Sequence, residues 1–471
     1  MSYSILLTME KEMITGKNLK QWGVPQGCVY SEILSFINDI GLHRKQAQKL
    51  VKDIVKNPNE YIEDSIWGKI AKSLLPIENK IIELNEKGCP VKIYGKHMIE
   101  QGALDQMEIA SRLPISIQAA IMPDGHQGYG LPIGGTLATD NAIIPFAVGF
   151  DIACRMHMTI TDINIGEMEG MRGKLKNVLI DNTFFGTGCK QDGKNDADVI
   201  SDDRFNIPSV KGLKNKAIDG LGTSGSGNHF ASYGKAKVDG LDGEWLAILT
   251  HSGSRGFGYG IAKHYTDLAL DRCKLPKEAQ HLAWLSMDSE EGQEYWEAMN
   301  LAGDYAKACH HLIHSRIVKS LGCNVEVDYE NHHNFAWKEE IEVNGEIKNV
   351  IIHRKGATPA GLGVTGIIPS SMSTLAYLVE GKGCKESLCS SSHGTGRTMS
   401  RTKAKEMFTV SDMKKDLESK GIELIGGGLD ECMSAYKKIE EVMEEQKDLV
   451  SIRGSFMPWM CRMAEEQKRK Y

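Results

Sequence analysis

Apolar residues in the first 90 positions of the chain recur with the period of an α-helix. Leu34, Ile37, Ile40 and Leu42 would fall on one face of such a helix, and the region is rich in lysine. A spacing of three to four residues between apolar positions is typical of an amphipathic helix. The pattern therefore predicts a helical N-terminal region over residues 1–90, either part of the domain that follows or packed on it.

The pattern changes after residue 90. The segment VKIYG predicts a short strand, and a helix follows it that ends before Pro114. From residue 120, short apolar runs alternate with glycine-rich loops, as in FAVGFDIACRM and LAILTHSGSRGFGYG. Such alternation indicates strands whose connecting loops carry the polar residues.

The second half of the chain mixes both kinds of element. Residues 288–321 have the periodicity of one long helix, and residues 322–355 predict strands with a hairpin turn at 344–346. Residues 362–400 return to loops rich in glycine and serine, and residues 411–447 are charged and predicted to be helical.

These segments together predict an α+β fold. The loops that carry reactive side chains extend from residue 124 to residue 397, without a Pro/Ser linker, an internal repeat or a low-complexity segment. We therefore expect residues 91–471 to form a single catalytic domain, with mixed or antiparallel sheets flanked by helices. Residues 1–90 would be its helical N-terminal extension.

Composition narrows the class of protein. The chain has 471 residues, a net charge of -6 and 11 cysteines, without a C-x-x-C pair or an apolar run long enough to span a bilayer. Scattered cysteines in odd number indicate reduced thiols, and we expect a cytoplasmic enzyme with no membrane partner. The acidic balance argues mildly against a nucleic-acid partner, so any RNA-binding surface must be local.

Five histidines lie in loops rich in glycine or serine, where a single histidine would usually be a surface residue. They are His126, His229, His251, His333 and His393. Asp151 and Cys154, in VGFDIAC, add a carboxylate and a thiol. This mixed set of nitrogen, oxygen and sulfur ligands suits zinc, manganese, iron or cobalt better than calcium or magnesium alone, and a thiolate can bridge two ions.

A second group of histidines lies on the predicted long helix. His310 and His314 are four residues apart and share a helix face, with His311 beside them. A zinc protease would need H-E-x-x-H, but His311 occupies the position of the glutamate. We expect a partly exposed helical face at this point.

Two short motifs offer alternative nucleotide chemistry. Residues 220–225 match the motif G-x-G-x-x-G. The sequence around them does not predict the buried strand before the motif and the helix after it that a dinucleotide-binding fold requires. The remaining interpretation is a glycine loop whose backbone N–H groups bind an anion. Lys237-Val238-Asp239-Gly240 matches K-x-D-G, the nucleophile motif of lysine-type nucleotidyltransferases. Its setting indicates a turn between two strands.

Several longer motifs, in order along the chain, resemble those of RtcB-type RNA ligases. They are MPDGHQGYGLPIGG, VGFDIAC, GSGNHF, HSGSRG, HHN, HRKGAT, IIPSSM and HGTGRTMSR. The resemblance extends from about residue 91 to the C-terminus. It implies an RtcB-like catalytic domain and an RNA ligase of RNA repair or tRNA processing.

The resemblance also implies a reaction and its participants. Members of the family join an RNA 3′-phosphate or 2′,3′-cyclic phosphate end to a 5′-hydroxyl end. They use GTP and two manganese ions and pass through a guanylated histidine and an RNA 3′-guanylate. A small activating protein serves some members. A neutral imidazole nitrogen is a suitable nucleophile near neutral pH.

The roles implied for this chain follow from the matched motifs. His393 would be the nucleophile, and Asp124 and His126 would support catalysis. The implied metal ligands are Asp151, Cys154 (bridging), His229, His251 and His333. The implied nucleotide contacts are Asn228, His333, Asn334, Pro369, Ser370, Ser371, Met372, Gly394, Thr395, Gly396 and Arg397. Candidates for phosphate contacts are Arg255, Arg354, Lys355 and Arg397.

The chain departs from the family pattern at several positions. Ala376 stands where the family often has a serine, and Met463 stands where the family's C-terminal lysine would contact the guanylate, with Arg462 as a candidate substitute. Ser370 and Arg155 each stand where the family usually has a glycine. Three alternatives to an active ligase follow: a metal-dependent phosphoesterase, a non-catalytic RNA-binding relative, and a lysine-type nucleotidyltransferase at Lys237.

Overall fold

The computed structural model describes residues 14–24, 29–74, 81–190 and 197–465. The parts of the predicted helical region at 1–13, 25–28 and 75–80 lie outside these residues. The chain divides into two compact units, residues 1–80 and 81–471. No helix of the described residues is long and apolar enough to cross a membrane.

The first unit is a small group of short helices. Its core consists of apolar side chains that are almost fully buried, among them Leu19, Ile37, Val51 and Trp67. Ala47, Val51 and Ile54 recur at helical spacing and give α3 its buried face. The helices are α1 (Gly16–Gln21), α2 (Val29–Ile40), α3 (Arg44–Lys56), the 3-10 turn η1 (Pro58–Tyr61) and α4 (Gly68–Leu74).

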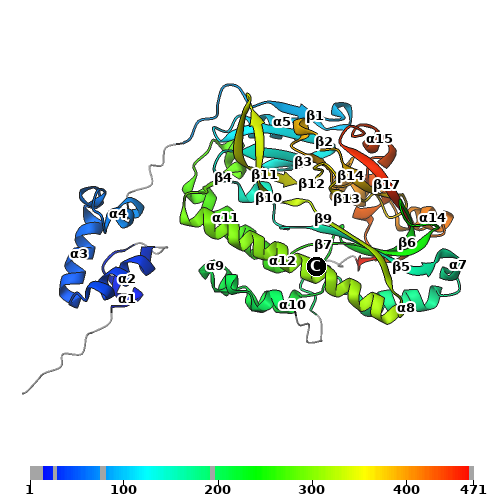
Figure 1. The fold of residues 1–471 in the computed structure, drawn as a ribbon, viewed down its shortest axis with the longest axis horizontal. Coiled ribbons are helices and arrows are strands. Elements are labelled where there is room, and N and C mark those ends of the chain that lie inside the picture. The colour runs from blue at the N-terminus through cyan, green and yellow to red at the C-terminus, as the bar shows by residue number, and fades with distance from the viewer. Residues whose placement is uncertain (1–13, 25–28, 75–80, 191–196, 466–471) are drawn as a thin grey trace, which may run out of the picture. The chain divides into compact units, whose positions relative to one another are not determined.

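The second unit is built around two sheets (Figure 1). The larger sheet has the strand order β13-β14-β17-β6-β7-β5-β9, with β16 also paired to β17. Its strands are β5 (Arg155–Asn164), β6 (Phe230–Val238), β7 (Trp245–Ser252), β9 (Val325–His332), β13 (Thr365–Ile368), β14 (Ala376–Gly381), β16 (Glu423–Gly427) and β17 (Val450–Glu465). Most pairs are antiparallel, but β16 runs parallel to β17.

The smaller sheet has the order β1-β2-β3-β11-β10. Its strands are β1 (Val91–Ile93), β2 (Ser116–Tyr129), β3 (Leu131–Thr139), β10 (Asn334–Val343) and β11 (Glu346–Lys355). Asn344 and Gly345 both have positive φ, which is the conformation of a two-residue hairpin turn between β10 and β11. Two short pairs complete the strands: β4 (Ala142–Ile143) with β8 (Leu285–Ser286), and β12 (Ala357–Pro359) with β15 (Ser390–Ser392).

Helices cover the sheets, and the longest crosses beneath β5 and β7 (Figure 1). This helix, α12, begins after Ser289, whose side chain accepts a hydrogen bond from Gly292 N, and ends at Gly322 in the left-handed conformation. The helices are α5 (Gln101–Ser111), α6 (Pro145–Val148), α7 (Ile165–Met168), α8 (Arg172–Asn182), α9 (Pro208–Lys211), α10 (Lys214–Gly220), α11 (Arg255–Arg272), α12 (Glu290–Leu321), α13 (Arg401–Met407), α14 (Val410–Ser419) and α15 (Ile439–Glu444).

The predicted fold class is confirmed: the chain is α+β, with mixed sheets flanked by helices and a helical N-terminal extension. The prediction of a charged helical segment over 411–447 is wrong for the residues around 423–427. Strand β16 lies there, paired with β17, and 3-10 turns follow it. Pairing with a distant strand stabilises this five-residue segment, and local periodicity carries no signal of such a partner.

Candidate active site

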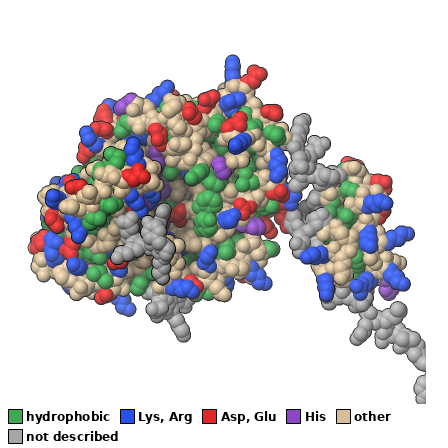
Figure 2. Space-filling model, turned by 180° about the vertical axis from the view of Figure 1, so that it is seen from behind, with side chains coloured by type: hydrophobic (Ala, Val, Ile, Leu, Met, Phe, Trp, Pro, Cys, Tyr) green, Lys and Arg blue, Asp and Glu red, His purple; other side chains and the backbone are tan. Residues whose placement is uncertain are grey.

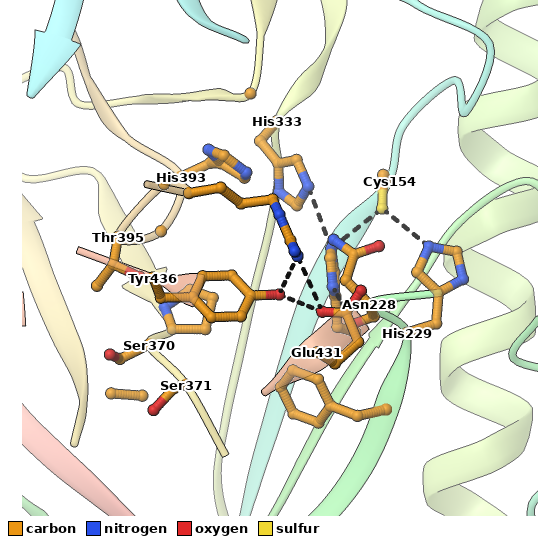
Figure 3. Close-up of a pocket in the computed structure, with 18 of the residues that line it drawn as sticks. Cys154, Asn228, His229, His333, Ser370, Ser371, His393, Thr395, Glu431 and Tyr436 are labelled. Atoms are coloured by element: carbon orange, nitrogen blue, oxygen red, sulfur yellow. Dashed lines mark hydrogen bonds and ion pairs between the residues drawn. The ribbon is translucent and has the colours of Figure 1, made fainter. Parts of the chain in front are cut away.

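One cavity of about 380 Å³ brings together residues from both sheets. All the implied metal ligands and nucleotide contacts line it, together with His126 and His393. Asp124 does not line it, because its side chain is fully buried beneath His393. In Figure 3, His333 lies between Cys154 and His229 on one side and His393 on the other.

Four side chains at one end of the cavity converge on Cys154. The Cys154 sulfur lies 3.4 Å from Nε2 of His229 and 3.1 Å from Nε2 of His251. Nε2 of His251 lies 3.3 Å from Nε2 of His333, and Nε2 of His229 lies 3.0 Å from the Asp151 carboxylate. Two groups able to hold a metal ion share Cys154: one with His251 and His333, the other with Asp151 and His229.

Backbone carbonyls orient two of these imidazoles. Nδ1 of His229 donates to the carbonyl of Ser224 at 2.7 Å, and Nδ1 of His251 donates to that of Asn228 at 3.1 Å. With the proton held on Nδ1, the lone pair of Nε2 faces the centre of the group. Such carbonyl partners are typical of histidines that bind metals.

The strand register explains how distant residues meet at this point. Arg155 pairs with Ser252 on one side and with His332 on the other, so Cys154, His251 and His333 come from the ends of three adjacent strands. Gly253 allows Asp151 to approach, because a Cβ at this glycine would lie 2.0 Å from Oδ1 of Asp151.

The surroundings keep this group largely uncharged in the absence of metal. Burial raises the pKa of the Cys154 thiol well above its usual value and lowers the pKa of His251 to about 3. Burial likewise holds the pKa of His333 well below its usual value. Burial is the largest single influence on Asp151 and opposes its ionisation, but the hydrogen bonds from His229 and Cys154, together with the charges of His229 and Arg255, lower its pKa to about 2. Neutral imidazoles beside a carboxylate suit a divalent ion of the zinc or manganese type.

His393 stands next to this group, with its ring centroid 4.8 Å from that of His333. Its Nδ1 lies 2.7 Å from Oδ2 of the buried Asp124, which also accepts the His393 backbone N–H at 3.2 Å. With Nδ1 facing the carboxylate, Nε2 is the nitrogen available to the cavity. His126 contacts the backbone carbonyl of Asp124 at 2.9 Å, and burial lowers its pKa to about 4.

Two loops line the cavity beside His393. Hydroxyl groups of Ser370, Ser371 and Thr374 form hydrogen bonds with one another on the first loop, and residues 394–396 form the second. Gly396 has φ of +71° and a Cβ there would lie 2.0 Å from the carbonyl oxygen of Asp124, so only glycine fits. Hydroxyl groups and glycine backbone at such a place suit a phosphorylated sugar.

The sequence motifs did not predict one further wall of the cavity. Tyr436 donates its hydroxyl proton to Glu431, and Arg401 forms an ion pair with the same carboxylate at 2.5 Å. Arg397 lies over the Tyr436 ring, 5.0 Å from its centroid, and Figure 3 shows Tyr436 and Glu431 facing the cavity. Three consecutive glycines at 426–428, just before this wall, are the signal that could have indicated a loop there.

The floor of the cavity is apolar sheet. Leu249, Phe456 and Met463 lie on it and are almost fully buried. Arg462 does not substitute for a lysine in the cavity, because its guanidinium donates to the carbonyls of Leu179 and Ile180. Met463, together with Cys461, therefore lines the cavity from this part of β17.

Of the other cationic candidates, only Lys355 and Arg397 line the cavity. Arg354 is buried and bound to Glu339 at 2.6 Å and to the Ser390 hydroxyl, and Arg255 donates to Thr223. Lys237 is exposed on β6, outside the cavity.

The expectation of a partly exposed histidine face on α12 is wrong. His310 and His314 are buried and lie with His157 from β5. The Thr250 hydroxyl contacts both helix histidines, at 2.9 and 2.8 Å, and hydrogen bonding of this kind allows polar rings to be buried. The rings of His157 and His314 stack at 3.8 Å, so their in-plane lone pairs do not point at a common ion.

Comparisons with known proteins find one family. A family model described as "tRNA-splicing ligase RtcB" matches residues 106–207 and 198–464. The tRNA-splicing ligase RtcB of Nanoarchaeum equitans is 32% identical over 456 residues, covering 80% of this chain and 96% of the relative. The RNA-splicing ligase RtcB of Escherichia coli K12 is 32% identical over 418 residues, covering 82% and 98%. That of Methanococcus maripaludis is 29% identical, covering 74% and 88%.

Proposed function

Because this chain belongs to the RtcB family, we propose that it is an RNA ligase that uses GTP and manganese and is guanylated on His393. The proposed substrates are an RNA end with a 3′-phosphate or 2′,3′-cyclic phosphate and an RNA end with a 5′-hydroxyl. Its role would be RNA repair or tRNA processing. One observation supports it most: His393 lies in the same cavity as the Cys154-centred ligand group.

The proposed reaction begins at His393. Nε2 attacks the α-phosphorus of GTP, a P–N bond forms and pyrophosphate leaves. Asp124 holds the proton of Nδ1 throughout and stabilises the positive charge that develops on the ring. Metal ions held by Asp151, Cys154, His229, His251 and His333 would neutralise phosphate charge when bound.

The next two steps transfer the guanylate. An oxygen of the RNA 3′-phosphate attacks the phosphorus on His393, which breaks the P–N bond and gives an RNA 3′-guanylate. A cyclic phosphate must first be opened by water. The 5′-hydroxyl of the second RNA then attacks the 3′-phosphorus, forms the phosphodiester and releases GMP. Lys355 and Arg397, the two cationic candidates that line the cavity, would contact these phosphates.

The catalytic role is assigned to the second unit, since all the implied site residues belong to residues 124–397. We also propose that a small activating protein assists turnover, as the resemblance implies.

The test is incubation with α-labelled GTP and manganese. A covalent label on the wild type that His393→Ala abolishes and Lys237→Ala leaves unchanged is the expected result. Ligation of RNA ends in the same preparation would then establish the full reaction. A label that survives in His393→Ala and disappears in Lys237→Ala would establish the lysine-type alternative. No label on any protein, with RNA phosphate released, would establish a metal-dependent phosphoesterase.

A further inference from the structure

The first unit lies outside the segment that matches the family, which begins at residue 106. Within it, α3 is the helix with the sharpest division between its two sides. Ala47, Val51 and Ile54 are buried in the core of the unit. The other side of the helix carries lysines, and Figure 2 shows Lys and Arg side chains prominent on the surface of this unit.

Four of these lysines form one line. Lys45, Lys49, Lys52 and Lys56 follow one another at spacings of four, three and four residues, and all four side chains are exposed. Such spacings place residues on one face of a helix. At a rise of about 1.5 Å per residue, the line is roughly 16 Å long. We call these four residues the lysine face.

The lysine face carries far more positive charge than its single nearby carboxylate, Asp53, can compensate. Among the residues that the structure describes, none of its four side chains has a carboxylate within ion-pair distance. Asp53, the acidic residue of α3, accepts hydrogen bonds from Tyr61 and Asn57, which lower its pKa, and the charges of Lys56 and Lys49 lower it further without forming an ion pair. By contrast, the exposed Lys263 of α11 pairs with Asp267 one turn away, as solvated helix faces usually do.

Like charges at these spacings destabilise a helix. The lysine face holds three such pairs, 45/49, 49/52 and 52/56. A polyanion laid along the face would remove this repulsion. It would also provide the local positive surface that a chain of net charge -6 needs in order to bind nucleic acid.

We propose that the lysine face of α3 binds the phosphate backbone of RNA, and so holds the RNA substrate at a second place on the chain. The choice of RNA rests on the proposed function. A membrane surface is the less suitable partner. A helix that lies in a membrane interface needs an exposed apolar side, whereas the apolar side of α3 is buried and the helix exposes no large hydrophobic residue.

The test measures binding of a labelled single-stranded RNA to the full chain at several salt concentrations. The variant is Lys45→Gln/Lys49→Gln/Lys52→Gln, and the matched control is Lys17→Gln/Lys20→Gln/Lys72→Gln, which removes three exposed lysines from α1 and α4 of the same unit. Glutamine and lysine have similar helix propensities, so both variants should fold. A third variant, with arginine at 45, 49 and 52, keeps the charge.

The lysine-face variant should bind RNA at least about tenfold more weakly near 0.1 M salt. The slope of log affinity against log salt should fall by about 2, because each lost phosphate contact on a single strand contributes about 0.7. The control should change less than about threefold, and the arginine variant should bind as the wild type does. Equal losses in variant and control, or no loss in either, would overturn the proposal.

Two further measurements separate this proposal from others. Vesicles of phosphatidylcholine and phosphatidylserine (3:1) should not bind the wild type; if they do, and RNA binding is unchanged in the variant, the lysine face is a membrane surface. Labelling of His393 with GTP should be equal in all four proteins. Loss of RNA binding in the variant without any label on the wild type would uphold the lysine face and reject the proposed ligase.

Discussion

Oδ2 of Asp124 lies 2.7 Å from Nδ1 of His393, and this contact determines which nitrogen of the ring faces the cavity. The carboxylate is fully buried, and its other oxygen, Oδ1, has no hydrogen-bond partner among the described residues. A buried carboxylate with so few donors has one evident partner, the histidine ring. The pair is therefore the first part of the site to test by substitution.

Asp124→Asn should slow the labelling of His393 by GTP. The amide keeps the shape of the side chain but cannot stabilise the charge that develops on the ring. Removing such a partner from a functional histidine typically costs about 10- to 100-fold in activity. Single-turnover labelling measures the rate, and Asp140→Asn, at an exposed aspartate, is the control. If the rate were unchanged, Asp124 would have no role in activating His393.

Gly253→Ala should weaken metal binding. The new Cβ would lie 2.0 Å from Oδ1 of Asp151, which must then move away from His229. We expect manganese affinity to fall by about tenfold or more, as when a ligand loses its orientation. Calorimetric titration with manganese measures this. Gly173→Ala is the control, because a Cβ at Gly173 meets nothing within 4 Å. Equal affinities in the two variants would contradict the assignment of Asp151.

Metal binding should release a proton from Cys154. Burial raises the pKa of this thiol well above its usual value, so the metal-free protein carries a neutral thiol between pH 6.5 and 8.5. A metal ligand must be the thiolate, whereas burial keeps His251 already neutral in this range. Manganese affinity should therefore rise about tenfold per pH unit. Cys154→Ala should bind more weakly and without that slope; a slope retained in the variant would place the proton elsewhere.

Lys355 should make the stability of the second unit depend on pH. Burial lowers the pKa of its ammonium to about 7, and its Nζ contacts the carbonyls of Tyr129 and Phe146. Above pH 7 the unfolded chain binds more protons at this side chain than the folded one, so the stability that Lys355 contributes rises with pH until the ordinary lysine pKa.

The measurement is the thermal unfolding midpoint from pH 6 to pH 8.5, without nucleotide. The wild type should gain stability with pH relative to Lys355→Met, and the difference should be largest at pH 6. Parallel curves for the two proteins would show that the Lys355 ammonium is not destabilised by its burial.

Sequence periodicity predicted the elements that local signals define. The long helix expected over 288–321 is α12 (Glu290–Leu321), because Ser289 and Gly322 supply its start and end. The hairpin at 344–346 formed because asparagine and glycine adopt positive φ readily. Strand β16 was missed because its stability comes from pairing with β17, a contact that no local window contains.

For the residues around the cavity, too, local motifs could be read from the sequence, whereas contacts between distant segments could not. Motifs indicated side chains in loops at the ends of strands, and Cys154, His251 and His333 lie close together in the structure, whereas their role as metal ligands stays a prediction. Glu431, Tyr436 and Arg401 were missed, since each takes its place through ion pairs and hydrogen bonds with the others.

The position of β17 has a consequence for how the protein is made. This strand lies between β14 and β6 in the larger sheet and supplies Phe456 and Met463 to the cavity floor. During translation, the ribosome releases Asp151, Cys154 and the histidines long before it releases β17. The side chains around Cys154 therefore emerge early, but the cavity lacks its floor until β17 has emerged and been inserted beside β6.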